Sequence, residues 1–144
     1  MTTTINADTV VGGAIVTGDA SGALGLQAAG TTLLTLSGST ATFAKGYTET
    51  VYTLGTSGSL ALDPANGTVQ TCALTGDPTF TDSLSAGQSV ILMLTNGASY
   101  TVTYPTMTWV TAAGNAAPTL TAADTLVFWK ISTTLYGAVV GSYA

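Results

Sequence analysis

The sequence predicts an all-β protein, with an antiparallel β-sandwich or jelly-roll-like domain at residues 51–144 and an extended, strand-rich N-terminal arm or a small β segment at residues 1–50. No window repeats apolar residues at the 3.6-residue period of an amphipathic helix with charges on the opposite face. Thr and Val are abundant and Gly recurs every few residues, which disfavours helices and suits strands and turns. Between residues 59 and 140, short β-prone runs are separated by turn signals about every 8–12 residues, a spacing typical of β-sandwiches.

The first strand pair of the domain is expected on either side of a cluster of turn residues. Residues 59–63 alternate between apolar and polar, and residues 68–75 form a β-branched run that ends at Gly76-Asp77-Pro78. Between the two runs lies Asp63-Pro64-Ala65-Asn66-Gly67, a segment rich in turn-forming residues. We therefore expect the two runs to pair as a hairpin or meander.

The clearest local turn signal is Asn96-Gly97, which separates the apolar run 89–95 from the β-prone run 98–104. Asn and Gly both tolerate the positive φ angles of a type I′ turn, whose twist matches that of two paired strands. Pro105 has no backbone N–H to donate and is expected to end the second strand. The sequence therefore predicts a hairpin of these two runs.

A further strand pair is expected at the C-terminal end. Small and polar residues at 112–123 indicate a loop. Two apolar, β-prone runs follow at residues 125–131 and 135–140, with Ser132-Thr133-Thr134 between them. We expect these runs to form the final two strands of the domain.

The N-terminal region contains three short apolar stretches, at residues 10–16, 24–27 and 31–36. Each is too short to form a core, so we expect them to gain stability by lying on a partner or by interleaving with copies of the chain. The alternative is that these strands complete the same sandwich. In the first case, the expected assembly contacts are Ile5, Val10, Val11, Ile15, Val16, Leu24 and Leu26.

The chain is poor in charge, with two basic residues, seven acidic residues and a charged fraction of 6%, against about 25% in an average soluble domain. Two basic residues cannot make the positive surface that nucleic-acid binding needs. No apolar run approaches the about 20 residues of a membrane-spanning helix, and the N-terminus lacks the pattern of a secretory signal. So little surface charge favours permanent contact with other proteins. The alternative is that Thr and Ser hydroxyls keep the surface hydrated.

No residue pattern indicates catalysis, a cofactor or a metal site, and we expect no enzyme activity. The chain has no His, which excludes Ser-His and Cys-His nucleophiles. Cys72 lies in a β-prone run without a basic neighbour, which indicates a buried structural thiol. Asp77 and Asp82 are candidates for a Ca²⁺ site, although aspartates in turns more commonly accept hydrogen bonds from backbone N–H groups.

A set of aromatic residues has two interpretations. Such residues line a carbohydrate-binding groove, or they fill a core or a subunit interface, which is the more common role. Lys130 is expected in solvent at a strand face or paired with Asp124. The aromatic set consists of Trp109, Phe128, Trp129 and Tyr136.

An ordered series of blocks occupies the second part of the chain: AGQSVILMLTNG at 86–97, YTVTYPTMTW at 100–109, APTL at 117–120, FWKI at 128–131 and LYGA at 135–138. Together they resemble a C-terminal β-domain of tailed-phage virion proteins that recurs in tail-fibre-like and capsid-decorating proteins. The resemblance covers about residues 50–144. Residues 5–13 and 21–27 are similar to low-complexity N-terminal segments of phage fibre proteins.

The resemblance implies a virion structural protein without cofactors, and a homotrimer, as phage fibre proteins usually are. Because the chain has no room for a fibre shaft or a large receptor-binding tip, we expect a capsid decoration (cement) protein that bridges and stabilises capsid subunits. It would lie on the surface of the phage particle after assembly in the host cytoplasm. The expected partners are copies of itself and the major capsid protein or other virion proteins. The alternatives are a short tail-fibre or adaptor protein that contributes to host adsorption, and a carbohydrate-binding module.

Overall fold

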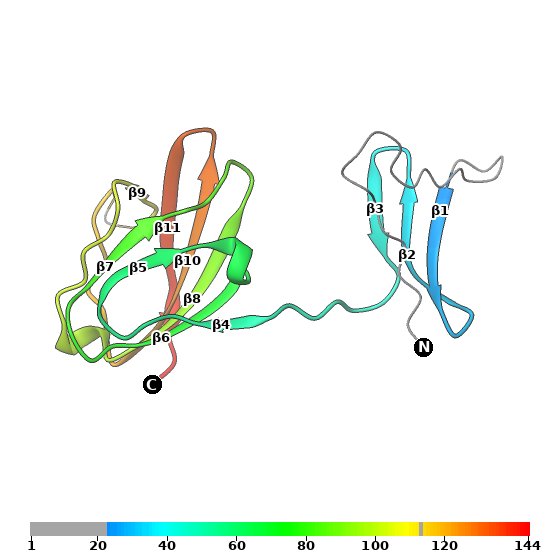
Figure 1. Cartoon of the computed structure of the whole chain (residues 1–144). Coiled ribbons are helices and arrows are strands. Elements are labelled where there is room, and N and C mark those ends of the chain that lie inside the picture. The colour runs from blue at the N-terminus through cyan, green and yellow to red at the C-terminus, as the bar shows by residue number, and fades with distance from the viewer. Residues whose placement is uncertain (1–22, 113) are drawn as a thin grey trace, which may run out of the picture. The chain divides into compact units, whose positions relative to one another are not determined.

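The all-β class predicted from the sequence is confirmed. The structure is a computed structural model that describes residues 23–112 and 114–144, and that part of the chain contains eleven strands and two short 3₁₀ helices. None of the helices in the described residues is long and apolar enough to span a membrane. The chain divides into two units, Met1–Thr48 and Glu49–Ala144 (Figure 1).

The described part of the first unit is a three-stranded antiparallel meander. Ala29 and Gly30, in its first turn, both have positive φ angles of 49° and 74°, the pattern of a type I′ turn. Residues 23–43 thus form a small hydrogen-bonded sheet of their own, and they do not complete the sheets of the second unit. The apolar stretch 10–16 lies outside the described residues. The strands are β1 (Ala23–Ala28), β2 (Thr31–Ser37) and β3 (Thr40–Phe43).

The second unit contains two sheets. The smaller sheet pairs β5 (Gly58–Leu62) with β7 (Pro78–Asp82). Two 3₁₀ helices, η1 (Pro64–Asn66) and η2 (Gly97–Ser99), lie in the connections between strands. The larger sheet has six strands in the order β4 (Val51–Thr53), β6 (Val69–Ala73), β8 (Ser89–Thr95), β10 (Ala123–Ile131), β11 (Thr134–Ser142) and β9 (Thr108–Trp109).

Much of the pairing in the second unit is parallel, because the chain passes back and forth between the two sheets. β4, β6 and β8 are parallel neighbours in one sheet, and β5 and β7, which follow β4 and β6, are parallel neighbours in the other. Thr103, which follows β8, forms a parallel bridge with Thr79 of β7. The chain from β4 to β8 therefore winds in successive turns between the two sheets, as in β-solenoids. The purely antiparallel sandwich is not confirmed, and the predicted hairpin of residues 59–63 and 68–75 is wrong because these runs lie in different sheets.

The predicted hairpin at Asn96-Gly97 is also wrong. Asn96 has a positive φ of 64°, but its Nδ2 donates a hydrogen bond to the carbonyl oxygen of Leu74 at 3.0 Å. A Cβ on Gly97 would lie 2.8 Å from the Cβ of Leu120, so glycine is needed here for a close approach between segments. β8 pairs with β6 and β10, not with the residues that follow it.

The predicted strand pair at the C-terminal end is confirmed. β10 and β11 are antiparallel neighbours, and Ser132 in the turn between them has a φ of 53°. β10 is also antiparallel to β8 and so joins the hairpin to the parallel strands. The loop predicted at residues 112–123 ends one residue earlier, because Ala123 begins β10.

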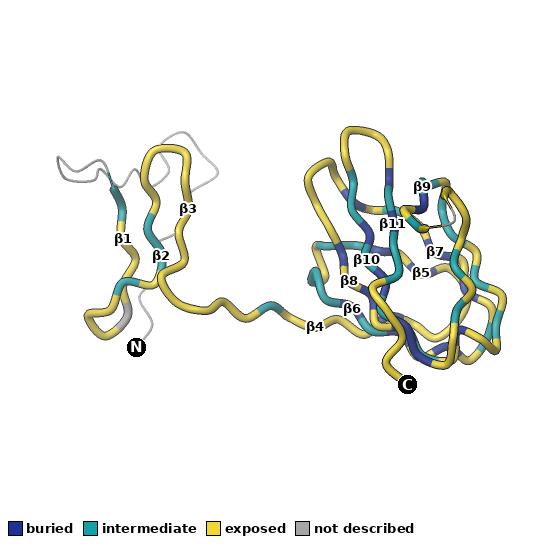
Figure 2. Tube along the Cα trace, turned by 180° about the vertical axis from the view of Figure 1, so that it is seen from behind, coloured by how far each residue is buried: buried dark blue, intermediate teal, exposed yellow. Residues whose placement is uncertain are grey.

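One hydrophobic core fills the space between the two sheets of the second unit. Leu60 and Phe80 contribute from the smaller sheet, and Leu92 and Phe128 from the larger one. Along β8, buried residues alternate with exposed ones, as Figure 2 shows in dark blue and yellow. The period-2 alternation of a strand thus determines which side chains of each sheet face away from the core.

The turn between β5 and β6 depends on two residues that cannot be exchanged freely. Gln70 is fully buried, and its Nε2 donates hydrogen bonds to the carbonyl oxygens of Asp63 at 2.7 Å and Gly67 at 3.0 Å. Gly67 has a φ of 133°, and a Cβ there would overlap the carbonyl oxygen of Thr50. Because the overlapping atom belongs to the backbone, no side-chain movement relieves the clash.

Gly67→Ala is expected to lower the free energy of unfolding of the second unit by about 3 kcal/mol, because it adds steric overlap to backbone strain. Gly87→Ala is the matched control: its φ is 87°, but no atom lies within 4 Å of the added Cβ, so we expect a loss of about 1 kcal/mol. Urea unfolding followed by tryptophan fluorescence measures both losses, since Trp109 and Trp129 lie in this unit. Equal losses in the two variants would contradict the proposed clash.

Candidate assembly surfaces

The meander of the first unit has one apolar face. Leu26 of β1 lies opposite Leu34 of β2, which lies opposite Phe43 of β3. Two residues along, apolar side chains again lie opposite one another on the three strands. Because paired residues and alternate residues share one side of a sheet, these side chains form a single surface. This meander face consists of Leu24, Leu26, Leu34, Leu36, Ala41 and Phe43.

The other side of the meander is polar. Gly25 lies opposite Thr35, which lies opposite Thr42, so small and hydroxyl-bearing residues fill the centre of this side. Among residues 23–27 and 29–48 none is buried, and Phe43 on the meander face is 58% exposed (Figure 2). A sheet with one apolar side normally packs that side against other protein. The described residues leave the meander face largely uncovered.

Two of the expected assembly contacts, Leu24 and Leu26, lie on the meander face, and Leu26 is 46% exposed. Leu34, Leu36 and Phe43 lie on the same face and were not among the expected contacts. The alternation of Leu34 and Leu36 with Thr35 was the signal that both lie on one side of a strand. The remaining expected contacts lie outside the described residues: Ile5, Val10, Val11, Ile15 and Val16.

The side of the six-stranded sheet that faces away from the core, which we call the outer face, has an apolar row at its centre and hydroxyl-bearing residues such as Thr71 and Thr125 beside it. A row of paired residues crosses β4, β6, β8, β10 and β11 in register. Ile91, in the middle of this row, is 42% exposed. The row consists of Val51, Val69, Ile91, Val127 and Ala138, and the outer face also includes Met93, Trp129 and Tyr136.

The aromatic residues divide between the two sides of the six-stranded sheet. Trp109 and Phe128 are buried in the core, with ring centroids 6.2 Å apart. Trp129 and Tyr136 lie on the outer face, where their rings stack with centroids 5.7 Å apart and an interplanar angle of 14°. The four residues therefore do not line one groove. The first pair fills the core, and the second pair is partly exposed.

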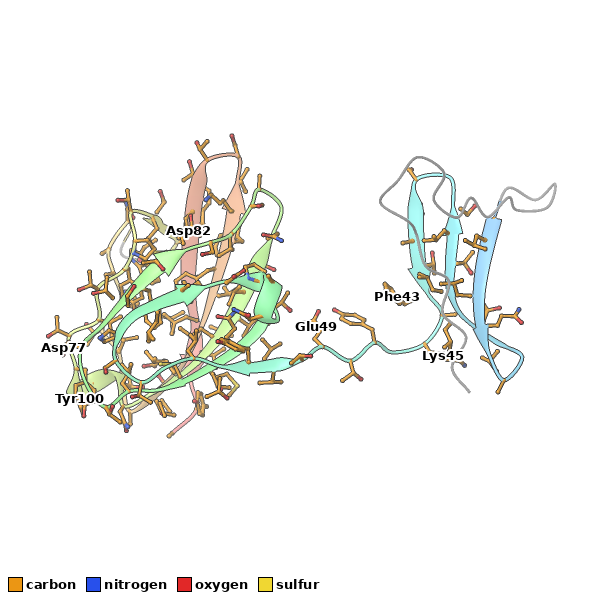
Figure 3. All side chains as sticks on the ribbon, viewed as in Figure 1. Phe43, Lys45, Glu49, Asp77, Asp82 and Tyr100 are labelled. Atoms are coloured by element: carbon orange, nitrogen blue, oxygen red, sulfur yellow. The ribbon has the colours of Figure 1, made fainter. Side chains whose placement is uncertain are left out.

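Asp77 and Asp82 do not form the Ca²⁺ site that their spacing allowed. They flank β7 from opposite ends (Figure 3). Asp77 Oδ1 accepts a hydrogen bond from the backbone N–H of Thr101 at 2.8 Å, and Asp82 Oδ1 accepts one from that of Leu84 at 2.9 Å. Within the part of the chain that the structure describes, no group of three or more His, Cys, Asp or Glu side chains is arranged to hold a metal ion. The interpretation of these aspartates as backbone hydrogen-bond acceptors is confirmed.

The expected pairing of Lys130 with Asp124 is wrong, because Lys130 Nζ lies 2.6 Å from Asp82 Oδ2. Asp124 is buried, and its carboxylate accepts hydrogen bonds from Thr121 N at 2.6 Å, Thr121 Oγ1 at 2.8 Å and Ser142 Oγ at 2.7 Å. Burial by itself raises the pKa of Asp124, but the hydrogen bonds from Ser142 and Thr121 outweigh it and hold the pKa below its usual value. This carboxylate connects the loop before β10 to the end of β11.

Two other buried groups stay protonated at neutral pH. Burial, with a smaller contribution from the negative charge of Asp124, raises the pKa of Tyr104. The ring of Tyr104 packs edge-on against Trp109, with centroids 4.8 Å apart. Cys72 is buried as expected, its Sγ donates to the carbonyl oxygen of Gly55 at 3.2 Å, and burial raises the pKa of this thiol. Both groups are therefore held in packed surroundings in their uncharged forms.

A hollow of about 580 Å³ opens beside the C-terminal strand. Val110, Pro118 and Val139 supply apolar walls, and Asp124 and Ser142 lie at its edge. The carboxylate of Asp124 already accepts the three hydrogen bonds described above. Among the described lining residues, the one acidic side chain, Asp124, is thus used in hydrogen bonds within the protein.

Comparisons with known proteins identify no relative. No family model, no curated protein and no solved structure matches the chain.

Asp124→Asn is expected to lower the free energy of unfolding of the second unit by about 2–3 kcal/mol at neutral pH, because an amide cannot accept all three hydrogen bonds. The folded pKa of Asp124 lies below the unfolded value of about 3.9. The contribution of the carboxylate is therefore complete above that pH and is lost as the pH falls through the folded pKa. The difference between the wild type and the variant, from urea unfolding, should shrink between about pH 6 and pH 2.

The matched control is Asp77→Asn, at an exposed carboxylate with one backbone hydrogen bond. We expect it to cost less than about 1 kcal/mol. A pH-independent difference for Asp124→Asn would show that the charge of this carboxylate does not stabilise the fold.

Proposed function

We propose that this chain is a structural protein of a phage virion, a capsid decoration protein that bridges and stabilises capsid subunits. Three features support the proposal. The blocks between residues 86 and 138 resemble a β-domain of tailed-phage virion proteins. The charged fraction is 6%, and each unit has an apolar sheet face that the described residues leave uncovered.

The observation that carries this proposal is the meander face. A small sheet with an uncovered apolar side is at best marginally stable in water. Laid on the surface of a capsid, the meander would cover Leu26, Leu36 and Phe43, which are all exposed in the single chain. Its opposite side, centred on Thr35 and Thr42, would face solvent. The first unit is thus the part of the chain proposed to contact the capsid.

The size of the meander face explains why several copies should act together. Three strands about 4.8 Å apart and about six residues long present roughly 300 Å². Covering that area stabilises a complex by about 7 kcal/mol, and an association cost of about 4–15 kcal/mol offsets most of it. A homo-oligomer holds several meanders near several capsid sites, which raises the overall affinity by about 10²–10⁴-fold. This favours a symmetric, bridging protein.

Leu26→Asp is expected to weaken binding to undecorated capsids of the phage that encodes the chain at least about 10-fold, because it places a charge in the covered face. Thr35→Asp adds the same charge to the polar side of the meander and is expected to change binding less than about 2-fold. Co-sedimentation of the full chain with capsids measures both variants against the wild type.

Two outcomes would overturn the proposal. The first is a wild-type chain that does not co-sediment with capsids at any concentration tested. The second is labelling of whole virions with an antibody against the chain that marks the tail alone, which would assign the chain to host adsorption instead.

A further inference from the structure

The middle parts of the central strands of the six-stranded sheet are apolar on both sides. In β8, Leu92 faces the core, whereas its neighbours Ile91 and Met93 face outward. β10 repeats the pattern, with Val127 directed outward between the buried Leu126 and Phe128, and Trp129 directed outward after Phe128. Strands of this composition are normally covered on both sides. The core covers one side of this sheet, and the described residues leave the other side partly exposed.

The smaller sheet of the same unit shows that this composition is not general. On β5 and β7, the outward residues are small or polar and exposed, with buried residues such as Leu60 and Phe80 between them. This is the alternation of a sheet with one side in water. One unit therefore has one sheet side suited to solvent and another suited to contact with protein. The outward residues of the smaller sheet are Ser59, Ala61, Thr79 and Thr81.

The outer face contains no Asp, Glu or Lys. A chain with a net charge of −5 repels its own copies, so copies meet most easily where no acidic group faces another. A symmetric contact places the same patch of both partners together, and an uncharged apolar patch is complementary to itself. The charged residues of the second unit lie outside this face, in the connections, at strand ends or on the core side: Glu49, Asp63, Asp77, Asp82, Asp124 and Lys130.

From these observations we propose that the outer face is the surface through which two copies of this chain associate, each packing it on the same face of the other in a symmetric dimer. This inference rests on the proposed function, which requires a homo-oligomer. It assigns capsid binding and self-association to different faces. The meander face binds the capsid, and the outer face binds the second copy. Trp129 and Tyr136 lie within the outer face, and buried Trp and Tyr supply much of the binding energy in protein interfaces.

The area of the outer face is consistent with a stable contact. Six strands about 4.8 Å apart, with on average about six residues at about 3.3 Å each, give a flat area of roughly 570 Å², without the added area of the side chains. A standard interface buries about 800 Å² of accessible surface on each partner. The outer face is therefore about the size that a stable contact between two copies needs.

Ile91→Lys tests the proposal at the centre of the apolar row. Because the chain is acidic, an added Lys lowers the overall repulsion between copies, so a loss of association must arise locally. Sedimentation velocity of the full chain between about 1 and 500 µM should show an oligomer for the wild type and a dissociation constant raised at least about 30-fold for the variant. Thr79→Lys, on the outward side of the smaller sheet, is the matched control and should associate as the wild type does.

A second readout separates lost association from lost folding. Of the two tryptophans, Trp109 is in the core and Trp129 is on the outer face. Acrylamide should quench one tryptophan in dilute wild type and neither in the oligomer, whereas in Ile91→Lys it should quench Trp129 at every concentration. If Trp109 is also quenched, Ile91→Ser, which adds no charge, replaces the variant and should still weaken association about 10-fold.

A wild-type chain that is monomeric at the highest concentration, or an Ile91→Lys or Ile91→Ser chain that associates as well as the wild type, overturns this inference. Neither measurement needs capsids. A wild-type oligomer that fails to bind capsids therefore overturns the proposed function alone, and an oligomer that is insensitive to Ile91 overturns the inference alone.

Discussion

The packing of the two sheets of the second unit against each other determines most of the remaining structure. Leu62, Leu92 and Phe128 are fully buried between the sheets. Because side chains alternate along a strand, a shift of one residue in register would expose this core and bury its neighbours. The core therefore also fixes which residues point away from it. Ile91 and Trp129 reach the outer face because Leu92 and Phe128 must face inward.

The sequence predicted the parts of the fold that depend on neighbouring residues. The pair β10 and β11 was found because its two strands are joined by a tight turn around Ser132. The parallel pairs among β4 to β8 were not found, because each joins strands separated by a whole passage through the other sheet. The hairpin predicted at Asn96-Gly97 was wrong for a different reason. Its residues serve contacts with Leu74 and Leu120, which lie far away in the sequence.

The candidate surfaces could be predicted only in part from the sequence. Leu24 and Leu26 were expected as assembly contacts, but their partners Leu34 and Leu36 require the register of β1 on β2. The apolar run containing Ile91 was interpreted as an ordinary strand, since a sequence does not say how many sides of a sheet are covered. The number of covered sides is known only from the structure, in which one side of β8 packs on the core and the other does not. The exposed apolar sides then follow from the fold rather than from any motif.

We propose that the exposed apolar faces of this chain are covered by other protein, including copies of the chain itself. The measurement that tests this most directly is the mass of the unmodified full chain in solution, by light scattering across a range of concentrations. We expect an oligomer, with the dimer formed through the outer face as its smallest form. A monomer at every concentration, with both apolar faces in water, would contradict it.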